Sequence, residues 1–288
     1  MWNGISQQVS DALGRDFKIV EKRRVSGGDI HQAFAIDDGH TRLFVKINDK
    51  HQLPLFEQEA LALNRLAQGK EIRVPEVVHV GTTGEHAFLV LEYLELESAT
   101  ASQWFVFGQQ LARMHRSQTQ AEYGFDEDNF IGTTEQPNRW QRNWARFFAE
   151  QRIGWQLKLA EEKGFQLGDL NRWVDACATA LQGHQPTASL LHGDLWRGNL
   201  GFYEGEPVLF DPASYYGDRE TDLAMSELFS RFPGDFYKGY DAEWPLDPGY
   251  NQRRPIYQLY HLLNHLNLFG GSYLQQCQQQ LREQFCDN

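Results

Sequence analysis

The hydrophobic pattern in the first part of the chain consists of short apolar stretches separated by turn-forming residues. Strand-forming residues concentrate in five stretches, at 17–25, 33–36, 42–47, 76–80 and 87–91. Polar turn residues separate the first three of these, at 26–29 and 37–40. The stretch 53–68 differs, because its apolar residues recur at helical spacing. This pattern predicts a small antiparallel sheet of five strands accompanied by one helix.

From Ala99 onward the hydrophobic spacing becomes helical over long segments. Five segments have the Leu, Phe and Trp spacing of buried helices, near 100–116, 138–163, 169–183, 219–231 and 252–285. Only the stretch 190–213 interrupts them, with short apolar runs and turns. The change of pattern predicts an α+β fold with a β-rich domain at residues 1–93 and a larger helical domain at residues 94–288.

Composition and charge limit the possible functions. The 288 residues are 41% hydrophobic, which is ample for the cores of a globular protein. The 27 basic and 39 acidic residues give a net charge of −12, which works against a broad electrostatic grip on nucleic acid or anionic lipid. The chain has no 18-residue apolar run, and its N-terminus lacks the features of a signal peptide, so a cytoplasmic protein is expected.

The three cysteines are scattered along the chain at Cys177, Cys277 and Cys286. They form no paired motif, and an odd number of scattered cysteines argues against a disulfide framework or a structural zinc site. We expect them to be reduced and mainly structural.

A lysine and a glutamate point to chemistry in the first domain. In the strand 42–47, the period-two alternation places Lys46 on the face opposite Val45. Lys46 alone is typical of a solvated lysine at a strand end. Glu59, however, falls on the apolar stripe of the following helix, where a carboxylate is costly unless a cation meets it. The two residues therefore predict an ion pair of the kind with which kinases position nucleotide phosphates.

Backbone groups in two further stretches suit a nucleotide. Gly27 and Gly28 form a turn in front of the lysine-bearing strand, and glycines let backbone N–H groups approach an anion. A plain hairpin turn explains them equally well, because the full G-x-G-x-x-G pattern is absent. The last predicted strand runs out into a connector, where the backbone of Glu92, Tyr93 and Leu94 is placed to bind an adenine edge.

The segment LLHGDLWRGNLGF carries the most specific chemical pattern. Asp194 is followed by Asn199, and Asp211 comes twelve residues after that Asn, at the end of an apolar strand. In kinases an Asp and an Asn at this spacing accept the hydroxyl proton and hold magnesium. Asp211 would be a second ligand, since Mg²⁺ prefers hard oxygen donors. The alternative that these Asp residues only cap turns does not explain why several spacings agree.

The histidines allow other interpretations. A catalytic base at His192 would need a Ser or Cys partner, and none is recognisable, which favours a role in bracing the loop through hydrogen bonds. His261 and His265 lie at i and i+4 on an apolar helix, a spacing that suits zinc. Leu262 stands where a metalloprotease has its Glu, so packing in the core or in a cleft is the favoured interpretation.

An acidic cluster at 216–224 leads into a predicted helix. Asp218 suits either the N-terminal cap of that helix or a contact with substrate or metal, and the pattern leaves both open. Asp222 and Arg219 are expected to brace the catalytic loop.

Taken together, these motifs resemble the fructosamine kinase family, relatives of aminoglycoside and choline kinases with the bilobal protein-kinase-like fold. The resemblance rests on HGDLWRGN, FDPA and YGDRETDLAM, with further likeness at 136–140 and 147–157, and so covers nearly the whole chain. It implies transfer of a phosphoryl group from ATP, with Mg²⁺, to the 3-hydroxyl of ketosamines. The product is unstable and releases its amine, which makes the reaction a deglycation step.

The resemblance also implies roles for the matched residues. Asp194 becomes the proton acceptor, Asn199 and Asp211 the magnesium ligands, and Lys46 with Glu59 the pair that positions the phosphates.

Residue type suggests the contacts with substrate. Trp196 and Trp140 could present aromatic faces to a sugar, and Asp218 a carboxylate to its amine. Some relatives carry a cysteine in the glycine loop that supports redox-switched dimers. This loop has Asp29 and no Cys, which puts that form of redox control in doubt.

Two rival functions remain. The first is a kinase for another hydroxylated amine, of the aminoglycoside or choline type, with the same catalytic residues. The second is a non-catalytic nucleotide-binding regulator, which would lack one of the catalytic residues named above, whereas all are present. A protein kinase is disfavoured, because no Ala-Pro-Glu motif or activation segment of the usual length follows Asp211. The expected partner is a small-molecule ketosamine or a glycated lysine; the choice between ribulosamine and fructosamine, and the oligomeric state, stay open.

Overall fold

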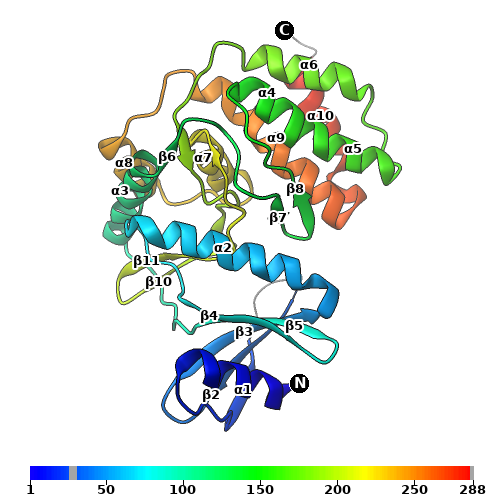
Figure 1. Ribbon diagram of the computed structural model, residues 1–288. Coiled ribbons are helices and arrows are strands. Elements are labelled where there is room, and N and C mark those ends of the chain that lie inside the picture. Colours follow the sequence, from blue (N-terminus) through cyan, green and yellow to red (C-terminus); the bar gives the residue numbers. More distant parts are fainter. Residues whose placement is uncertain (26–30, 286–288) are drawn as a thin grey trace. The chain divides into compact units, whose positions relative to one another are not determined.

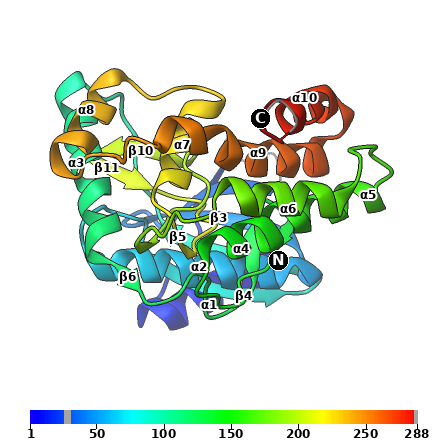
Figure 2. The same cartoon turned by 90° about the horizontal axis from the view of Figure 1, so that it is seen from above.

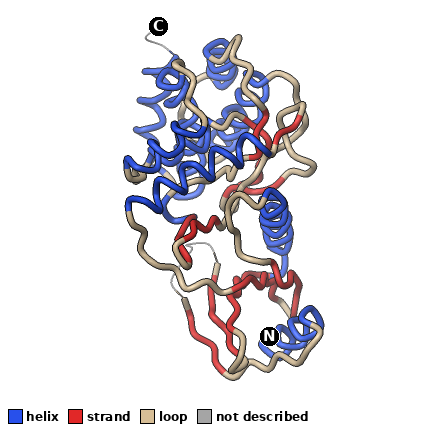
Figure 3. Tube along the Cα trace, turned by 90° about the vertical axis from the view of Figure 1, so that its left-hand side faces the viewer, coloured by secondary structure: helices blue, strands red, loops and turns tan. Residues whose placement is uncertain are grey.

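The computed structural model describes residues 1–25 and 31–285. The chain forms two compact units, Met1–Ser98 with Gly201–Asp211, and Ala99–Leu200 with Pro212–Asn288. Long strands dominate the first unit and helices the second (Figure 3).

The units differ in extent from the predicted domains, which divide after residue 93. The first unit keeps residues 94–98 and also holds the later hairpin 201–211. Backbone hydrogen bonds explain this, because Glu97 N–H donates to Phe202 O over 2.8 Å and Leu209 N–H donates to Arg73 O over 3.0 Å. The hairpin therefore belongs to the first unit although it lies far along the chain.

A five-stranded antiparallel sheet is the centre of the first unit, in the order β1-β2-β3-β5-β4. Strands β2 to β5 are labelled in Figure 1. Its strands are β1 (Glu21–Arg24), β2 (Gln32–Asp37), β3 (Arg42–Asp49), β4 (Val77–Thr83) and β5 (His86–Glu92). In the central pair, Val45 lies opposite Val90 and Lys46 opposite Leu89. The five predicted strands are confirmed, with ends shifted by up to four residues. The shift is largest at β1, where the apolar start of the predicted stretch lies before the strand.

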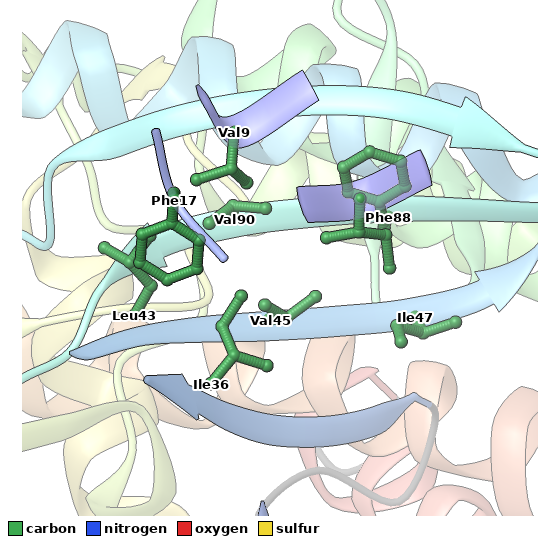
Figure 4. Packing of buried hydrophobic residues seen from close by; sticks show 9 residues of the cluster. Val9, Phe17, Ile36, Leu43, Val45, Ile47, Phe88 and Val90 are labelled. Atoms are coloured by element: carbon green, nitrogen blue, oxygen red, sulfur yellow. The ribbon is translucent and has the colours of Figure 1, made fainter. Parts of the chain in front are cut away.

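Two helices cover the two faces of this sheet. On one face, α1 (Trp2–Leu13) contributes to a buried cluster that Figure 4 shows. Its members are Ile5, Val9, Phe17, Ile36, Leu43, Val45, Ile47, Phe88 and Val90. On the other face, α2 (Leu53–Gly69) packs Phe56, Ala60 and Leu63 against alternate residues of β5. The predicted alternation along β3 is confirmed, because Val45 belongs to the first cluster and Phe44 packs against the second.

Helix α1 corrects the prediction of a single helix in this part of the chain. Its sequence WNGISQQVSDAL has Ile5 and Val9 at i and i+4, both fully buried. These two apolar positions stand among polar residues, so the helical signal is weak when it is read alone. Burial against the sheet stabilises the helix.

The second unit is mainly helical. Its helices are α3 (Ala101–Ser117), α4 (Trp144–Phe148), α5 (Trp155–Glu162), α6 (Leu170–Ala180), α7 (Glu220–Leu228), α8 (Gly234–Glu243), α9 (Tyr250–Phe269) and α10 (Leu274–Phe285). A π-helical segment, Ala149–Gly154, joins α4 to α5. Helix α9 packs against α5, α7 and α10 (Figure 2).

Short strands complete the architecture. The second unit contains β6 (Thr119–Gln120), β7 (Asn129–Ile131), β8 (Thr134–Gln136), β9 (Ala188–Leu190) and β12 (Tyr216–Gly217). Strand β9 lies between β12 and β6, and β7 pairs with β8. The late hairpin consists of β10 (Leu200–Tyr203) and β11 (Glu206–Leu209).

Two helical predictions in the second unit were wrong. The segment 252–285 forms two helices, because the chain breaks at Gly270 with φ +89°. Helix α8 was not predicted at all, since its sequence contains two glycines and follows a proline. Its packing on α3 explains why it forms there. A Cβ on Gly108 would lie 2.0 Å from Phe236 O, and a Cβ on Gly239 would lie 2.0 Å from Phe105 O, so glycine permits the close approach.

Two observations bear on membranes and cysteines. Within the described ranges, no helix combines the length and apolarity that a membrane span requires. Cys177 and Cys277 are free and buried, and burial raises the pKa of both thiols. These two therefore agree with the prediction of reduced, structural cysteines; Cys286 lies outside the described residues.

The core of the first unit makes a stability prediction. Phe88 is fully buried, and Phe88→Ala should lower the free energy of unfolding by about 3–5 kcal/mol, because it removes the ring and leaves a cavity. Urea denaturation measures the change. The control is Val20→Ala, at a side chain that is 67% exposed, which should change stability by less than about 0.5 kcal/mol. Equal stability of the two variants would contradict this account of the core.

Candidate active site

Lys46 lies in the first unit between two carboxylates. It stands on the face of β3 that α2 covers, and only 7% of the residue is exposed. Its Nζ donates to Glu59 Oε1 over 2.7 Å and to Asp211 Oδ1. The predicted pair of Lys46 and Glu59 is therefore present, and the structure adds Asp211 as a second partner.

Lys46 brings one positive charge to two carboxylates, so the charges of these three side chains do not cancel. Burial alone would lower the pKa of Lys46, but the charges of Asp211 and Glu59 outweigh it and raise that pKa above its ordinary value. Burial, together with the charge of Asp211, raises the pKa of Glu59 to about 7, against the opposing effect of Lys46. One cation thus serves two carboxylates, and a further cation near Asp211 would relieve the excess negative charge.

Asp211 has an unusual backbone conformation. It follows β11 with φ +54°, a left-handed value that is uncommon for residues other than glycine. Such conformations cost free energy and are concentrated at functional sites. The hydrogen bond between Leu209 N–H and Arg73 O anchors the strand just before it. The first unit therefore holds this carboxylate in a fixed place beside Lys46.

The predicted nucleotide-binding backbone is only partly described. Gly27 and Gly28 lie outside the described residues. Glu92 ends β5, and its N–H donates to Glu76 O over 2.8 Å, so this N–H is already used within the first unit. Tyr93 and Leu94 follow in the connector and are half-buried. Any adenine contact of Glu92 must therefore use its carbonyl.

In the second unit, the loop His192–Asp194 is fixed by one buried carboxylate. Asp222, on α7, accepts the backbone N–H of His192 over 2.7 Å at Oδ2 and that of Gly193 over 2.9 Å at Oδ1. Burial opposes ionisation of Asp222, but the hydrogen bond with His115 and the two nearby imidazoles lower the pKa of its carboxyl. The predicted bracing role of Asp222 is confirmed.

Glycine is required at position 193. Gly193 has φ +87°, and a Cβ there would lie 1.9 Å from Ala213 O. Ala213 N–H in turn donates to His192 O over 2.9 Å, which holds the two backbone segments together. A side chain would force them apart, so the Gly of the HGD motif follows from the packing.

Asp194 and Asn199 are directly connected. Asn199 Nδ2 donates over 2.9 Å to both Asp194 O and Asp194 Oδ2. The 3₁₀ turn Arg197–Asn199 brings the amide back to the carboxylate. His192 Nδ1 accepts the N–H of Asp194 over 3.2 Å, as expected for a histidine that braces the loop. Because Nδ2 of Asn199 is used toward Asp194, the amide oxygen is the atom that suits a cation.

The sequence did not single out the residues behind Asp222. His115 on α3 contacts Asp222 Oδ2 through Nε2 over 3.1 Å and Tyr240 Oη through Nδ1 over 2.8 Å. Both side chains are buried. The only signal for His115 is a polar residue in the apolar spacing of a predicted helix, which does not identify its partner.

Arg219 and Asp218 both contact later parts of the second unit. Arg219 lies 3.8 Å from the Trp244 ring and donates to Trp244 O over 2.7 Å, so it braces the chain after α8. It also donates to Tyr240 Oη over 3.3 Å, and Tyr240 contacts His115, so its link to the loop through Asp222 is indirect. Asp218 is only 1% exposed, and its carboxylate accepts from Tyr257 Oη over 2.6 Å and from Glu220 N–H over 3.1 Å. Because these bonds occupy a buried carboxylate at the start of α7, the geometry favours the capping alternative over contact with substrate.

The two predicted aromatic contacts differ in exposure. Trp196 follows the catalytic loop and is 39% exposed, with its ring over Gly198. Trp140 is half-buried, and its ring centroid lies 6.0 Å from that of Tyr216. Trp196 therefore offers the larger accessible aromatic face.

Metal-ligating side chains gather at one place in the described part of the chain. His184, Asp218 and Glu220 offer ligand atoms within 4.8 Å of one another. Asp218 already accepts hydrogen bonds there, and Glu220 pairs with Arg253 over 2.8 Å. His261 and His265 are not part of this group. The alternative of a zinc site on α9 thus gains no third ligand among the described residues.

Three comparisons relate the chain to known proteins. The family model described as fructosamine kinase matches residues 1–286. A protein of Vibrio parahaemolyticus named as a probable ketoamine kinase is 52% identical over 279 residues, which is 96% of this chain and 97% of the relative. An Escherichia coli protein named in the same way is 44% identical over 281 residues, 98% of each chain.

Solved structures agree with these matches. A crystal structure from Haemophilus somnus, assigned as a fructosamine-3-kinase, has a TM-score of 0.94 at 38% identity and covers 98% of this chain and 97% of its own. The aminoglycoside phosphotransferase APH(4)-Ia, in complex with AMP-PNP and hygromycin B, has a TM-score of 0.64 at 14% identity, over 97% and 98% of the chains. The second likeness is one of fold, and it confirms the predicted kinase-like α+β fold.

The carboxylate behind the loop makes a further stability prediction. Asp222→Asn leaves one oxygen for two backbone donors, so the free energy of unfolding should fall by about 1–3 kcal/mol, the usual cost of an unsatisfied buried donor. The control is Asp169→Asn, which should be neutral, because Asp169 caps α6 from an exposed position and Asn is an equally good cap. Urea denaturation compares the two. Equal effects would mean that Asp222 does not hold the loop as described.

Proposed function

This chain belongs to the fructosamine kinase family and is a phosphotransferase, and we propose that it phosphorylates the 3-hydroxyl of ketosamines with ATP as donor. The acceptors would be ribulosamines or fructosamines, either free or on protein lysines. One observation carries the proposal: a carboxylate, Asp194, hydrogen-bonded to Asn199 on a loop that the buried Asp222 holds. This is the arrangement that phosphoryl transfer to a hydroxyl requires.

Asp194 acts as the proton acceptor in this proposal. The acceptor hydroxyl gives its proton to the Asp194 carboxylate while its oxygen bonds to the γ-phosphorus of ATP. The bond between that phosphorus and the bridging oxygen of ADP breaks, and ADP leaves. Asn199 Nδ2 holds Oδ2 of Asp194 over 2.9 Å, which fixes the direction of the carboxylate before the substrate arrives.

Lys46 supplies positive charge to the phosphates. Its two carboxylate partners keep it protonated and hold its long side chain in one place. A fixed cation stabilises the charge that is spread over the phosphoryl oxygens during transfer. Glu59 then serves to position Lys46. Backbone groups of Gly27, Gly28, Tyr93 and Leu94 and the Glu92 carbonyl are the proposed contacts for the remainder of the nucleotide.

Asp211 and Asn199 are the proposed ligands for Mg²⁺. Both supply hard oxygen atoms, and Mg²⁺ needs few such ligands besides phosphate oxygens and water. The surplus negative charge around Lys46 and the left-handed backbone of Asp211 fit a residue that is held to meet a cation. When bound, Mg²⁺ would neutralise the phosphate charge.

The proposed product, a ketosamine 3-phosphate, would be unstable. A ketosamine carrying a phosphate at its 3-position releases the amine, so phosphorylation would free a glycated amine or lysine. The chain would thereby act in deglycation. The proposed sugar-contacting residues are Trp196 and Trp140, of which Trp196 is the more exposed.

The test of the proposed function is ADP release from ATP and Mg²⁺ with ribulose-lysine, fructose-lysine, aminoglycosides and choline. Turnover is expected on the ketosamines. Asp194→Asn should lower kcat by about 10²–10⁴-fold, the usual contribution of a general base, with the KM for ATP little changed. NMR of the product should place the phosphate on the 3-oxygen.

The alternative outcomes separate the hypotheses. Turnover only on an aminoglycoside or choline would keep the mechanism and overturn the substrate. Full activity of Asp194→Asn on a ketosamine would overturn the assignment of the proton acceptor.

Trp196 provides a prediction about the acceptor. Trp196→Ala should raise the KM for the ketosamine by about tenfold, the loss expected when a stacking face for a sugar is removed, and leave the KM for ATP unchanged. The control is Trp155→Ala, at a partly exposed Trp on α5 whose Nε1–H donates to Glu135 O in β8. An unchanged KM for the ketosamine in Trp196→Ala would remove this residue from the substrate site.

A further inference from the structure

His261 on α9 faces the catalytic carboxylate within the second unit. It is only 3% exposed, and its Nδ1 lies 3.9 Å from Asp194 Oδ1. Among the described residues, this buried Nδ1 has no hydrogen-bond partner. Buried polar atoms are rarely left in this state, because each loses its hydrogen bond to water. The position therefore needs an explanation that packing alone does not give.

The neighbouring histidine shows the contrast. His265, one turn later on α9, places its Nδ1 2.8 Å from His261 O, so its ring nitrogen is satisfied within the helix. Its ring packs against Phe229, Phe269 and Tyr273. His265 thus has the surroundings of a packed side chain, whereas His261 points a polar atom at a carboxylate that it does not reach.

His261 is neutral in this environment. Burial, and after it the charge of His265, lower the pKa of His261 to about 3, against the opposing charge of Asp222. A neutral imidazole carries one N–H donor and one acceptor nitrogen. Near physiological pH it can offer a hydrogen bond to an oxygen without forming an ion pair with Asp194.

The distance between His261 Nδ1 and Asp194 Oδ1 determines which group can lie between them. At 3.9 Å, Nδ1 and Oδ1 are too far apart for a direct hydrogen bond, which ends near about 3.2 Å. One oxygen atom between them can lie at about 2.8 Å from each. The other oxygen of Asp194, Oδ2, accepts from Asn199 over 2.9 Å, so Oδ1 is the oxygen that turns toward His261. An acceptor hydroxyl matches both atoms, since it donates to a carboxylate and accepts from an N–H.

We propose that His261 is a further substrate-binding residue, whose Nδ1–H donates to the oxygen of the acceptor hydroxyl while that hydroxyl points its proton at Asp194 Oδ1. This inference rests on the proposed function, because it assigns Asp194 the acceptor hydroxyl. The hydrogen bond orients one lone pair of the oxygen and leaves the other for the phosphoryl group. His261 thereby selects an acceptor with a hydroxyl at this place.

The test compares three replacements of His261. His261→Asn keeps a donor close to the position of Nδ1, His261→Gln moves the donor toward the position of Nε2, and His261→Leu removes it. The kinetic constants for the ketosamine and for ATP are measured separately. His261→Leu and His261→Gln should lower kcat/KM for the ketosamine by about tenfold or more, the value of one hydrogen bond, with the KM for ATP within about twofold. His261→Asn should recover most of that loss.

The matched control is Asn264→Leu on the same helix. Asn264 is a buried polar side chain, 2% exposed, that accepts from Gln156 Nε2 over 3.2 Å and is not paired with Asp194. Asn264→Leu should lower stability without a selective change in kcat/KM for the ketosamine. If it weakens acceptor use as much as His261→Leu does, or if His261→Asn rescues nothing, the role of His261 is structural and the inference fails.

A spectroscopic readout complements the kinetics. In ¹⁵N-histidine NMR of the full chain, His261 should stay neutral and carry its proton on Nδ1, and its Nδ1 signal should shift when the ketosamine is added. No shift at saturating ketosamine would overturn the inference even if turnover occurs. If the wild type instead turns over only another hydroxylated amine, the proposed function fails separately, and the same variants and spectra are measured with that acceptor.

Discussion

The conformation of the loop His192–Asp194 depends on its hydrogen bonds with the buried carboxylate of Asp222. Two consecutive backbone N–H groups, of His192 and Gly193, point at its two oxygens, and no side chain of the loop is needed for this contact. A carboxylate is expensive to bury, so it must be paired and hydrogen-bonded. His115 and the two N–H groups meet that requirement and keep its pKa low. The loop conformation and the charge of Asp222 therefore stabilise each other.

The first unit also buries charged side chains, but there the positive and negative charges do not cancel. Lys46 is a buried cation that meets two carboxylates, Glu59 and Asp211, so the group carries surplus negative charge. Burial raises the pKa of Glu59, and the charge of Asp211 adds to that effect. A lysine paired with a single carboxylate would be electrically neutral and would not attract a further ion. A lysine with two carboxylates favours a further cation, which is what a magnesium-dependent phosphoryl transfer requires.

The parts of the fold and site that the sequence predicts are those that depend on local pattern. The alternation along β3 fixes the face of Lys46, and the apolar stripe of α2 fixes that of Glu59, so their pairing follows from two short periodicities. The spacing of Asp194 and Asn199 is set by a single short turn. Such features need no knowledge of distant segments.

The parts that were missed depend on contacts between distant segments. Helix α8 looks unfavourable when read alone, and it forms because Gly108 and Gly239 let it approach α3 closely. The contacts of Asp218 and Arg219 also could not be read from the sequence, because polar residues at the start of a helix can point either toward a site or into the protein. Their partners Tyr257 and Trp244 both lie more than twenty residues further along the chain.

The two histidines of α9, His261 and His265, differ in what their surroundings allow them to bind. His261 and His265 lie on nearly the same side of α9, yet one faces a carboxylate and the other an aromatic cluster. Charge decides what the first can do. A cation beside Asp194 would form an ion pair and lower the basicity of that carboxylate, which would hinder proton acceptance. The burial that keeps His261 neutral avoids this conflict, so a hydrogen-bond donor can stand next to the carboxylate that we propose as the proton acceptor.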